Sequence, residues 1–437
     1  MMPTEDAVAD PRHDRIADLL KSKLDEIRVR DGELGQRDRF RGRPAARHGA
    51  GPGQAFEGYD GAGPDAPRTA PAADVPSASA TAGAPAIPQY GEVFLPTPDV
   101  SESVGARLRA RAAVPTFDGP PEDEVEALRS KWLQAYRGAT PAEAVGGHPS
   151  RSHRDLIEVL EVRTVRVQTP EAFDVRQRLA RNLALVPGVR EATAVRLREE
   201  GYADLEALCA HERFGVHARR LCRQLRDGDT AGLVDRVGAR LGRSAPLALA
   251  LCSFLDPSDL LFLDIETMGL FGGSPIVVAG LAHATGGALQ MRQWIAASPD
   301  AEAALVREVA DAAASRGALV TFNGRSFDWP YICGRAAFWG RPVRSDPAHF
   351  DLLPFSRRAW RGKTTDCRLS TLAREVLGLH RAEDLPGALV PRFYQEYLDD
   401  PAHRAGLLAA IAVHNRHDVE ETVRLFGALV ARGDADA

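Results

Sequence analysis

The C-terminal part of the chain contains an order of strand-like and helix-like segments that narrows its fold class. Apolar stretches at residues 260–266, 275–284, 289–296 and 318–323 are predicted to be strands. A helical segment at residues 300–315 separates the third strand from the fourth, and the rest of the chain is predicted to be mainly helical. Three strands, a helix, a further strand and more helices indicate an α/β domain, a mixed sheet with flanking helices. We place this domain at residues 254–434.

The residues before this domain show three kinds of sequence. Residues 1–31 are predicted to contain a short amphipathic helix, either a docking element or only a frayed helix. Residues 32–88 are rich in Gly, Ala and Pro, and we expect a disordered linker there, because such a stretch cannot bury enough apolar surface to fold. Residues 89–180 are a mixed segment without an assigned function. It is predicted to form a helix over 125–138 and a helix running into a strand over 152–170.

Residues 181–245 are predicted to form a small α-helical domain built around a turn at Pro187-Gly188-Val189. The segment resembles a helix-hairpin-helix module, and residues 214–229 resemble a more degenerate second copy. In that family the hairpin presents backbone N–H groups to a DNA phosphate, so Gly188 and Arg190 are candidate nucleic-acid contacts. Arg190 stands where the family pattern has its second glycine. The turn is therefore either a phosphate site or a closed hairpin with a structural role only.

Four carboxylates in the C-terminal domain form a candidate reaction centre. Asp264 and Glu266 lie two residues apart at the end of an apolar strand, so both side chains project from the same face. Burying two like charges is costly unless a cation neutralises them. Asp328 is expected to begin a helix after the Asn323-Gly324 turn, and Asp418 is expected near the start of a helix at residues 414–426.

The order of these motifs resembles the signature of DEDD exonucleases: D-x-E on a strand, then N-x-x-x-F-D, then a His or an aromatic residue with an Asp one turn later. The segment 320–332 looks much like the proofreading exonuclease of family B polymerases. The wider set TFNGRSFD, HFDLLPFSRRAW, CRLSTLAREVLGL, EDLPG and HNRHDVEETVRL is similar to the YprB-like ribonuclease H-like family. This resemblance covers roughly residues 254–430. It implies a DnaQ-like, ribonuclease H-like fold and 3′–5′ exonuclease activity.

The resemblance also implies that Asp264, Glu266, Asp328 and Asp418 hold two Mg²⁺ or Mn²⁺ ions. Two ions about 3.5–4 Å apart would activate a water molecule and stabilise the departing 3′ oxygen. His414 is the candidate general base, because its unperturbed pKa is near neutrality. It lies four positions before the last Asp, whereas the His subclass of the family has a spacing of five. His417 is a rival, and a site without an essential base is a third reading.

A basic stretch from Arg335 to Arg374 contains nine Arg or Lys residues against three Asp. With Phe350, Phe355 and Trp360 interleaved, it predicts either a groove for a polyanion with aromatic stacking platforms or a plain solvated face. Asp351, a fifth acid, is interpreted as the partner of a nearby arginine or as a group near the metals. The candidate nucleic-acid contacts of this domain are Asn323, Arg325, Phe327, Arg357, Arg358 and Lys363.

Composition narrows the choice of function. A net charge of −5 over 437 residues argues against a protein that coats nucleic acid by bulk attraction. No run of about 18 apolar residues predicts a membrane span, and the polar N-terminus lacks a secretory pattern. Five cysteines without a CxxC pair fit a reducing cytoplasm. No P-loop occurs, so any unwinding is expected from a partner helicase, as the resemblance also implies.

We therefore expect a cytoplasmic, metal-dependent nuclease with a DNA repair role. DNA is preferred over RNA only because of the hairpin module, and single-stranded DNA is the expected form of the substrate. Two alternatives stay open: a ribonuclease with the same metal site, and a non-catalytic adaptor that binds nucleic acid. The presence of all four acids argues against the adaptor, because a site without catalysis would be free to lose one.

Overall fold

The computed structural model describes residues 120–269, 273–344, 347–381 and 384–435. The predicted N-terminal helix and linker lie outside the described residues. The described residues belong to one compact unit, Asp118–Ala437.

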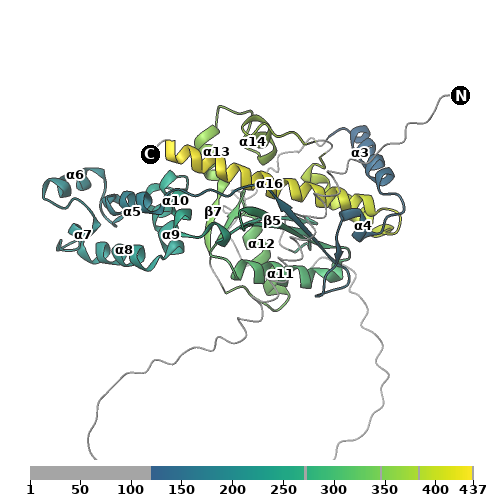
Figure 1. The fold of residues 1–437 in the computed structure, drawn as a ribbon, viewed down its shortest axis with the longest axis horizontal. Helices are drawn as coiled ribbons and strands as arrows, with labels where there is room; N and C mark the ends of the chain where they lie inside the picture. Colours follow the sequence, from purple (N-terminus) through teal and green to yellow (C-terminus); the bar gives the residue numbers. More distant parts are fainter. Residues whose placement is uncertain (1–119, 270–272, 345–346, 382–383, 436–437) are drawn as a thin grey trace, which may run out of the picture. The chain divides into compact units, whose positions relative to one another are not determined.

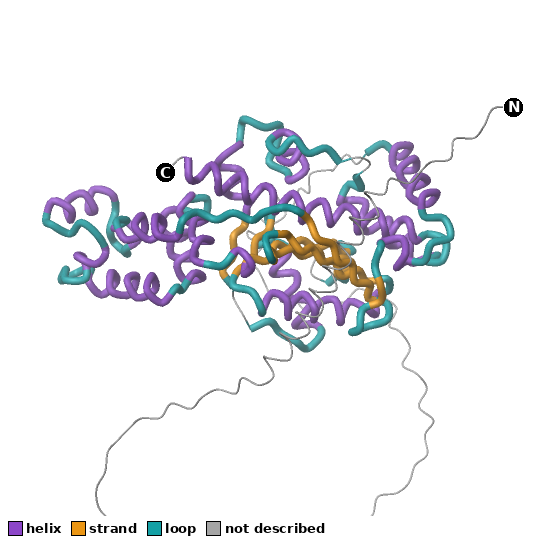
Figure 2. The backbone as a smooth tube through the Cα atoms, viewed as in Figure 1, coloured by secondary structure: helices purple, strands orange, loops and turns teal. Residues whose placement is uncertain are grey.

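A mixed sheet forms the centre of this unit (Figures 1 and 2). It has seven strands in the order β1-β2-β5-β4-β3-β6-β7. The strands are β1 (His148–Pro149), β2 (Leu156–Arg163), β3 (Leu260–Thr267), β4 (Ile276–Thr285), β5 (Ala288–Ala296), β6 (Ala318–Thr321) and β7 (Ala348–Asp351). β3 pairs with β6, and β6 with β7, in parallel, while the other neighbours are antiparallel. The predicted fold class, a ribonuclease H-like mixed sheet with flanking helices, is confirmed.

Helices cover both faces of the sheet. The long helix α16 (Ala405–Ala435) lies across one face (Figure 1). There Phe426 packs edge-on against Phe262 of β3, with ring centroids 5.5 Å apart. On the other face, α11 (Glu302–Ala314) and α12 (Asp328–Phe338) share a core with Leu261 and Leu263. The remaining helices of four or more residues outside the helical module are α3 (Glu122–Ala135), α4 (Pro141–Val145), α13 (Leu352–Trp360), α14 (Leu369–Glu375) and α15 (Val390–Asp399), with η3 (Leu251–Phe254) leading into β3.

A set of short helices at residues 172–250, called the helical module below, is inserted between β2 and β3. Its elements are α5 (Ala172–Ala180), η2 (Leu183–Leu185), α6 (Glu191–Glu199), α7 (Leu205–Leu208), α8 (Gly215–Asp227), α9 (Thr230–Leu241) and α10 (Pro246–Ala250). α9 contacts β7, α10 contacts α16, and the buried residues of the module join those of the sheet in one core. In the part of the chain that the structure describes, no helix has the length and apolar character needed to cross a membrane.

The four predicted strands and the helix between them are present, with small shifts at their ends. Two expectations were wrong. Residues 152–155 do not form a helix, because Ser150 and His153 side chains accept hydrogen bonds from the backbone of Ser152 and Asp155 and hold a turn before β2. The strand β7 was not expected, since His349 and Asp351 interrupt the apolar pattern that marks the equally short β6.

Candidate metal centre

The strand β3 brings two carboxylates to the face that α16 covers. Its first four residues are buried and apolar, and they fix the strand between β4 and β6. Asp264 is half-buried and Glu266 is 8% exposed. The Asn415 side chain donates from Nδ2 to Oδ2 of Asp264, at 2.8 Å, and to its carbonyl oxygen, at 3.1 Å. This pair of bonds connects the strand to α16.

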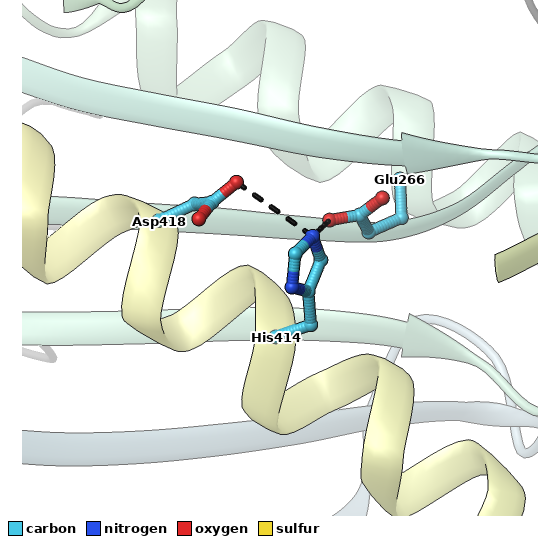
Figure 3. Close-up of side chains that lie close together, drawn as sticks. All are labelled: Glu266, His414 and Asp418. Atoms are coloured by element: carbon cyan, nitrogen blue, oxygen red, sulfur yellow. Dashed lines mark ion pairs between the residues drawn. The ribbon is translucent and has the colours of Figure 1, made fainter. Parts of the chain in front are cut away.

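Glu266, His414 and Asp418 meet at this face (Figure 3). His414 and Asp418 are one helical turn apart on α16, and Nε2 of His414 lies 3.8 Å from Oδ2 of Asp418. The same nitrogen lies 3.7 Å from Oε1 of Glu266. One potential ligand atom from each of the three residues lies within 4.8 Å of the others. The spacing of four between His414 and Asp418 is therefore compatible with a shared site.

Asp328 enters from the far side of β3. It begins α12, is 4% exposed, and its Oδ1 accepts a hydrogen bond from the backbone N–H of Ile265 at 3.1 Å. The preceding turn is tightly built: Asn323 has a φ of 67°, and a Cβ at Gly324 would lie 2.5 Å from the Thr321 side chain. The Asn323-Gly324 pair thus aims the helix start, and with it Asp328, at the strand that carries the other acids.

Burial and mutual repulsion raise the pKa of three carboxyl groups, those of Asp264, Glu266 and Asp328. For Asp264, burial is the main cause of the raised pKa, and the charges of Asp418 and Glu266 add to it. Burial raises the pKa of Glu266 to about 8, with attraction to His414 opposing the rise, and that of Asp328 to about 7. A divalent cation relieves this repulsion, and hard carboxylate oxygens are the ligands that Mg²⁺ and Mn²⁺ prefer. The donor set therefore fits the expected ions.

His414 has a partner that sequence reasoning missed. Its Nδ1 lies 2.9 Å from Oδ1 of Asp384, whose pKa is lowered because hydrogen bonds from the histidines and the charge of Arg381 outweigh its burial. An ionised carboxylate only accepts, so Nδ1 carries the proton and Nε2 faces Glu266 and Asp418. Burial alone would lower the pKa of His414, but the Asp384 hydrogen bond and the surrounding carboxylates raise it to about 9.

Arg381 is a second unpredicted member of the site. Its guanidinium is hydrogen-bonded to Oδ1 of Asp418 and to both carboxylate oxygens of Glu421, and it lies 2.7 Å from Oδ2 of Asp384. One oxygen of Asp418 is thus held by Arg381 while the other faces His414. The sequence signal for this part of the site was the EDLPG segment, which includes Asp384 and follows Arg381 closely. It carried part of the family resemblance, but no role was assigned to it.

Asn415 is the third unpredicted member. It is fully buried, and its Oδ1 accepts a hydrogen bond from Nε2 of Gln293 on β5 at 2.8 Å. A Cβ at Gly280 would lie 2.2 Å from this oxygen, so glycine lets α16 approach the sheet closely. Its position directly after His414 was the only signal in the sequence.

The rival histidine lies further from the acids. Nδ1 of His417 is 3.9 Å from Oδ1 of Asp384, and His417 is not part of the group formed by Glu266, His414 and Asp418. Asp418 itself is in the middle of α16, which begins at Ala405, and not near a helix start as expected. The apolar residues of the first turns, as in GLLAAIA, continue the helical pattern upstream of the motif.

The basic stretch is exposed at some predicted positions and buried at others. Phe350 is 1% and Phe355 is 7% exposed, so the expectation that they are stacking platforms was wrong: both belong to the core. Trp360 is partly buried against that core, and Phe327 is half-buried with its ring 5.3 Å from Tyr331. The exposed predicted contacts are Asn323, Arg357, Arg358 and Lys363, with Arg325 half-buried.

Asp351 has a structural role that neither earlier reading described. Its carboxylate accepts backbone N–H groups of Asn323 at 2.8 Å, Arg325 at 3.3 Å and Leu353 at 3.1 Å. It therefore caps α13 and holds the turn before Asp328 at the same time.

The predicted hairpin in the helical module is present as a turn between η2 and α6. Gly188 has a φ of 83°, and Gly188 and Arg190 are both exposed. Arg190 is the N-cap of α6 and its side chain makes no capping hydrogen bond. Arg240 of α9 donates to the carbonyls of Ala184, Val186 and Val189, which ties the hairpin to the rest of the module. The identity of this turn as a helix-hairpin-helix stays a prediction.

With this geometry in view, comparison with known proteins identifies the domain. Residues 261–430 match the family described as the RNase_H superfamily, so the C-terminal part of the chain is a ribonuclease H-like domain. It is similar to the uncharacterized protein YprB of Bacillus subtilis (strain 168), with 34% identity over 173 residues. The match covers 39% of this chain and 41% of the relative, so the chain spans less than half of the length of that protein. The domain is YprB-like.

A solved structure was also found: the family B DNA polymerase from the hyperthermophilic archaeon Pyrobaculum calidifontis. The match has 22% sequence identity and a TM-score of 0.32, and it covers 39% of this chain and 24% of that chain.

Proposed function

We propose that the ribonuclease H-like domain is a metal-dependent 3′–5′ exonuclease that hydrolyses phosphodiester bonds of nucleic acid. The observation that carries this proposal is the cluster of Glu266, His414 and Asp418 beside two further acids, the half-buried Asp264 and the buried Asp328. Carboxylates with raised pKa values around one point of a ribonuclease H-like sheet are what a divalent-metal nuclease requires.

In this proposal Asp264, Glu266, Asp328 and Asp418 hold Mg²⁺ or Mn²⁺. When bound, such ions supply the positive charge that phosphodiester hydrolysis needs at its attacking and leaving oxygens. His414 presents Nε2 to the same point and, once Nε2 is deprotonated, takes the proton of the attacking water. With its pKa raised to about 9, this requires alkaline pH or a bound cation that lowers the pKa again. Asp384 keeps the other ring nitrogen protonated and fixes the orientation of the ring. Asn415 holds the Asp264 carboxylate in place.

We propose DNA as the substrate, single-stranded DNA in particular, with DNA repair as the setting. The support is the helical module, whose exposed turn at Gly188 and Arg190 precedes the α6 N-terminus and suits a phosphate of the backbone. A helicase partner belongs to the same proposal. Ribonuclease activity at the same metal site is the alternative, and the experiment below separates the two.

The proposal is tested by incubating purified full-length protein with end-labelled single- and double-stranded DNA and RNA, in Mg²⁺, Mn²⁺ or EDTA. Labels at the 5′ and at the 3′ end report the polarity of cleavage. We expect shortening of single-stranded DNA from its 3′ end in the presence of metal and none in EDTA. Glu266→Gln should abolish cleavage, while Arg154→Gln, at a side chain that is 89% exposed, should not.

Near-wild-type cleavage by the Glu266 variant would contradict the metal-site assignment. Cleavage of RNA alone would replace DNA with RNA as the substrate. Removing the helical module is a poor test, because Leu233 and Val237 of α9 are buried in the core shared with the sheet. Arg190→Ala in the intact chain is the better way to examine the hairpin.

A further inference from the structure

Two cavities meet at Arg357, and arginines from three separate segments line them. The first, of about 230 Å³, is lined by Arg243 of the helical module, by Arg325 in the turn before α12, and by Arg357 of α13. The second, of about 390 Å³, is lined by Arg357, Arg361 and Arg368. We call the two together the arginine trough. Its walls come from both the helical module and the ribonuclease H-like domain.

The trough adjoins the metal centre through one loop. Asn323 and Arg325 line the first cavity, and the same loop leads into α12, whose first residue is Asp328. Asp351 holds the backbone of both loop residues, and its charge helps to raise the pKa of Asp328. A ligand in the first cavity would therefore lie against the segment that positions one of the acids.

The acids in the trough are already engaged. Asp235 pairs with Arg325 at 3.5 Å, and Asp366 pairs with Arg368 at 3.7 Å. Asp351 is satisfied by three backbone N–H groups. Among the residues that the structure describes, no carboxylate lies within ion-pair distance of the three exposed arginines Arg243, Arg357 and Arg361. They form an uncompensated positive surface along the trough.

These arginines are not required for folding in the way that others in the same region are. Arg240 donates hydrogen bonds to three carbonyls of the hairpin, and Arg176 donates to the carbonyl of Leu225. Arg243, only three residues after Arg240, is exposed and faces the first cavity instead. Placing like charges together without partners is unfavourable unless a polyanion binds there.

From this geometry we infer that the arginine trough binds the phosphodiester backbone of a nucleic-acid strand whose end is held at the acids. The inference rests on the proposed nuclease function and deepens it. The helical module and the ribonuclease H-like domain then bind the same nucleic-acid strand, through Arg243 on one wall and Arg357 and Arg361 on the other. Their ligand is the phosphate, which DNA and RNA share, so the trough sets the length of strand that binds tightly and not its sequence.

The test is the salt dependence of binding, measured on full-length protein with the inactivating change Asp264→Asn. Fluorescent single-stranded DNA and RNA of 3 and 20 nucleotides are each titrated with protein in EDTA. Three proteins are compared: one with the wild-type trough residues, a triple variant that combines Arg243→Gln, Arg357→Gln and Arg361→Gln, and the matched control Arg154→Gln. For single strands, the slope of log affinity against log salt falls by about 0.7 for each phosphate contact that is lost. We expect the triple variant to lose about two units of slope on the 20-mer and the control to lose none.

The inference is contradicted if the triple variant and the control have the same slope on the 20-mer. It is also overturned if the triple variant weakens binding of the 3-mer as much as that of the 20-mer, because the arginines would then act at the acids themselves. Loss of slope on DNA but not on RNA, or the reverse, supports the trough and identifies its source of phosphate. Loss of slope in a protein whose wild-type form cleaves nothing supports the trough while removing the nuclease proposal.

Discussion

The Asp384 carboxylate illustrates how single residues around His414 decide what that histidine can do. A histidine among carboxylates could donate from either nitrogen, and the two tautomers would have different chemistry. The hydrogen bond of 2.9 Å from Nδ1 to Asp384 selects one of them and leaves Nε2 for the reaction. Asp384 touches neither substrate nor metal in this scheme, so it is a positioning residue.

Replacing Asp384 with Asn should therefore weaken catalysis less than removing the base. We expect a loss of about 10–100-fold in kcat for Asp384→Asn, as for other residues that orient a reacting side chain, against about 10²–10⁴-fold for His414→Ala. The KM should change little. Because Asp384 raises the pKa of His414 and a base acts in its deprotonated form, the acidic limb of the pH–rate profile should move to lower pH in the Asn variant. Single-turnover kinetics from pH 6 to 9 measure both effects, and an unshifted profile with unchanged kcat would show that Asp384 is not coupled to the base.

Among the elements, α16 and β4 show how the close packing of a helix on a sheet brings candidate catalytic side chains to the site. Gly280 faces Asn415 and Val419, and an added Cβ would lie 2.2 Å from Oδ1 of Asn415 and 2.8 Å from Cγ2 of Val419. Asn415 cannot move without loosening its hydrogen bonds to Gln293 and Asp264, and Val419 is held on the same helix.

Gly280→Ala should therefore lower the free energy of unfolding by about 1–3 kcal/mol through overpacking, and it should reduce activity because Asp264 loses its support. Gly427→Ala is the matched control on α16, since no atom outside the helix lies within 4 Å of its added Cβ. That change should raise stability by about 0.5–1 kcal/mol, because alanine is the better helix former. Denaturant unfolding of both variants is the measurement. Equal effects of the two changes would mean that the close approach at Gly280 is not constrained.

The elements were predictable to different degrees for physical reasons. β3, β4 and β5 are long and apolar, so their pattern stood out, and the acids on β3 could be placed on one face by alternation alone. β7, with polar residues at two of its four positions, showed no apolar run. Asp384, Arg381 and Asn415 could not be found because their roles depend on contacts across the sheet and between helices, such as the bond from Gln293 on β5 to Asn415 on α16. Phe350 and Phe355 were misjudged since a basic neighbourhood in sequence says nothing about which side of a helix or strand is buried.

For the whole molecule, the acids gathered at the candidate metal centre lower the stability of the fold while they are ionised. Asp264, Glu266 and Asp328 have pKa values above those of unfolded carboxyl groups. Each therefore contributes most to stability at low pH, while it is protonated, and this contribution is lost as the pH rises through the raised folded value. With about 8 for Glu266 and about 7 for Asp328, the loss should be largely complete a little above pH 8. Without metal, repulsion between these ionised acids should therefore lower the free energy of unfolding above about pH 8.

Asp264→Asn should consequently be more stable than the wild-type protein at pH 8 in EDTA. The amide removes one negative charge, and its oxygen can still accept the hydrogen bond from Asn415. At pH 5 the difference should shrink, because the wild-type acids are then largely protonated. Saturating Mn²⁺ should reverse the order: binding at 100 times the dissociation constant stabilises the wild-type by about 2.7 kcal/mol, and the variant, lacking a ligand, gains less. Denaturant unfolding at pH 5 and 8, in EDTA and in Mn²⁺, measures all four cases. A variant that is less stable than the wild-type in EDTA at pH 8 would show that the acids are not in conflict, and that they were not gathered to hold a cation.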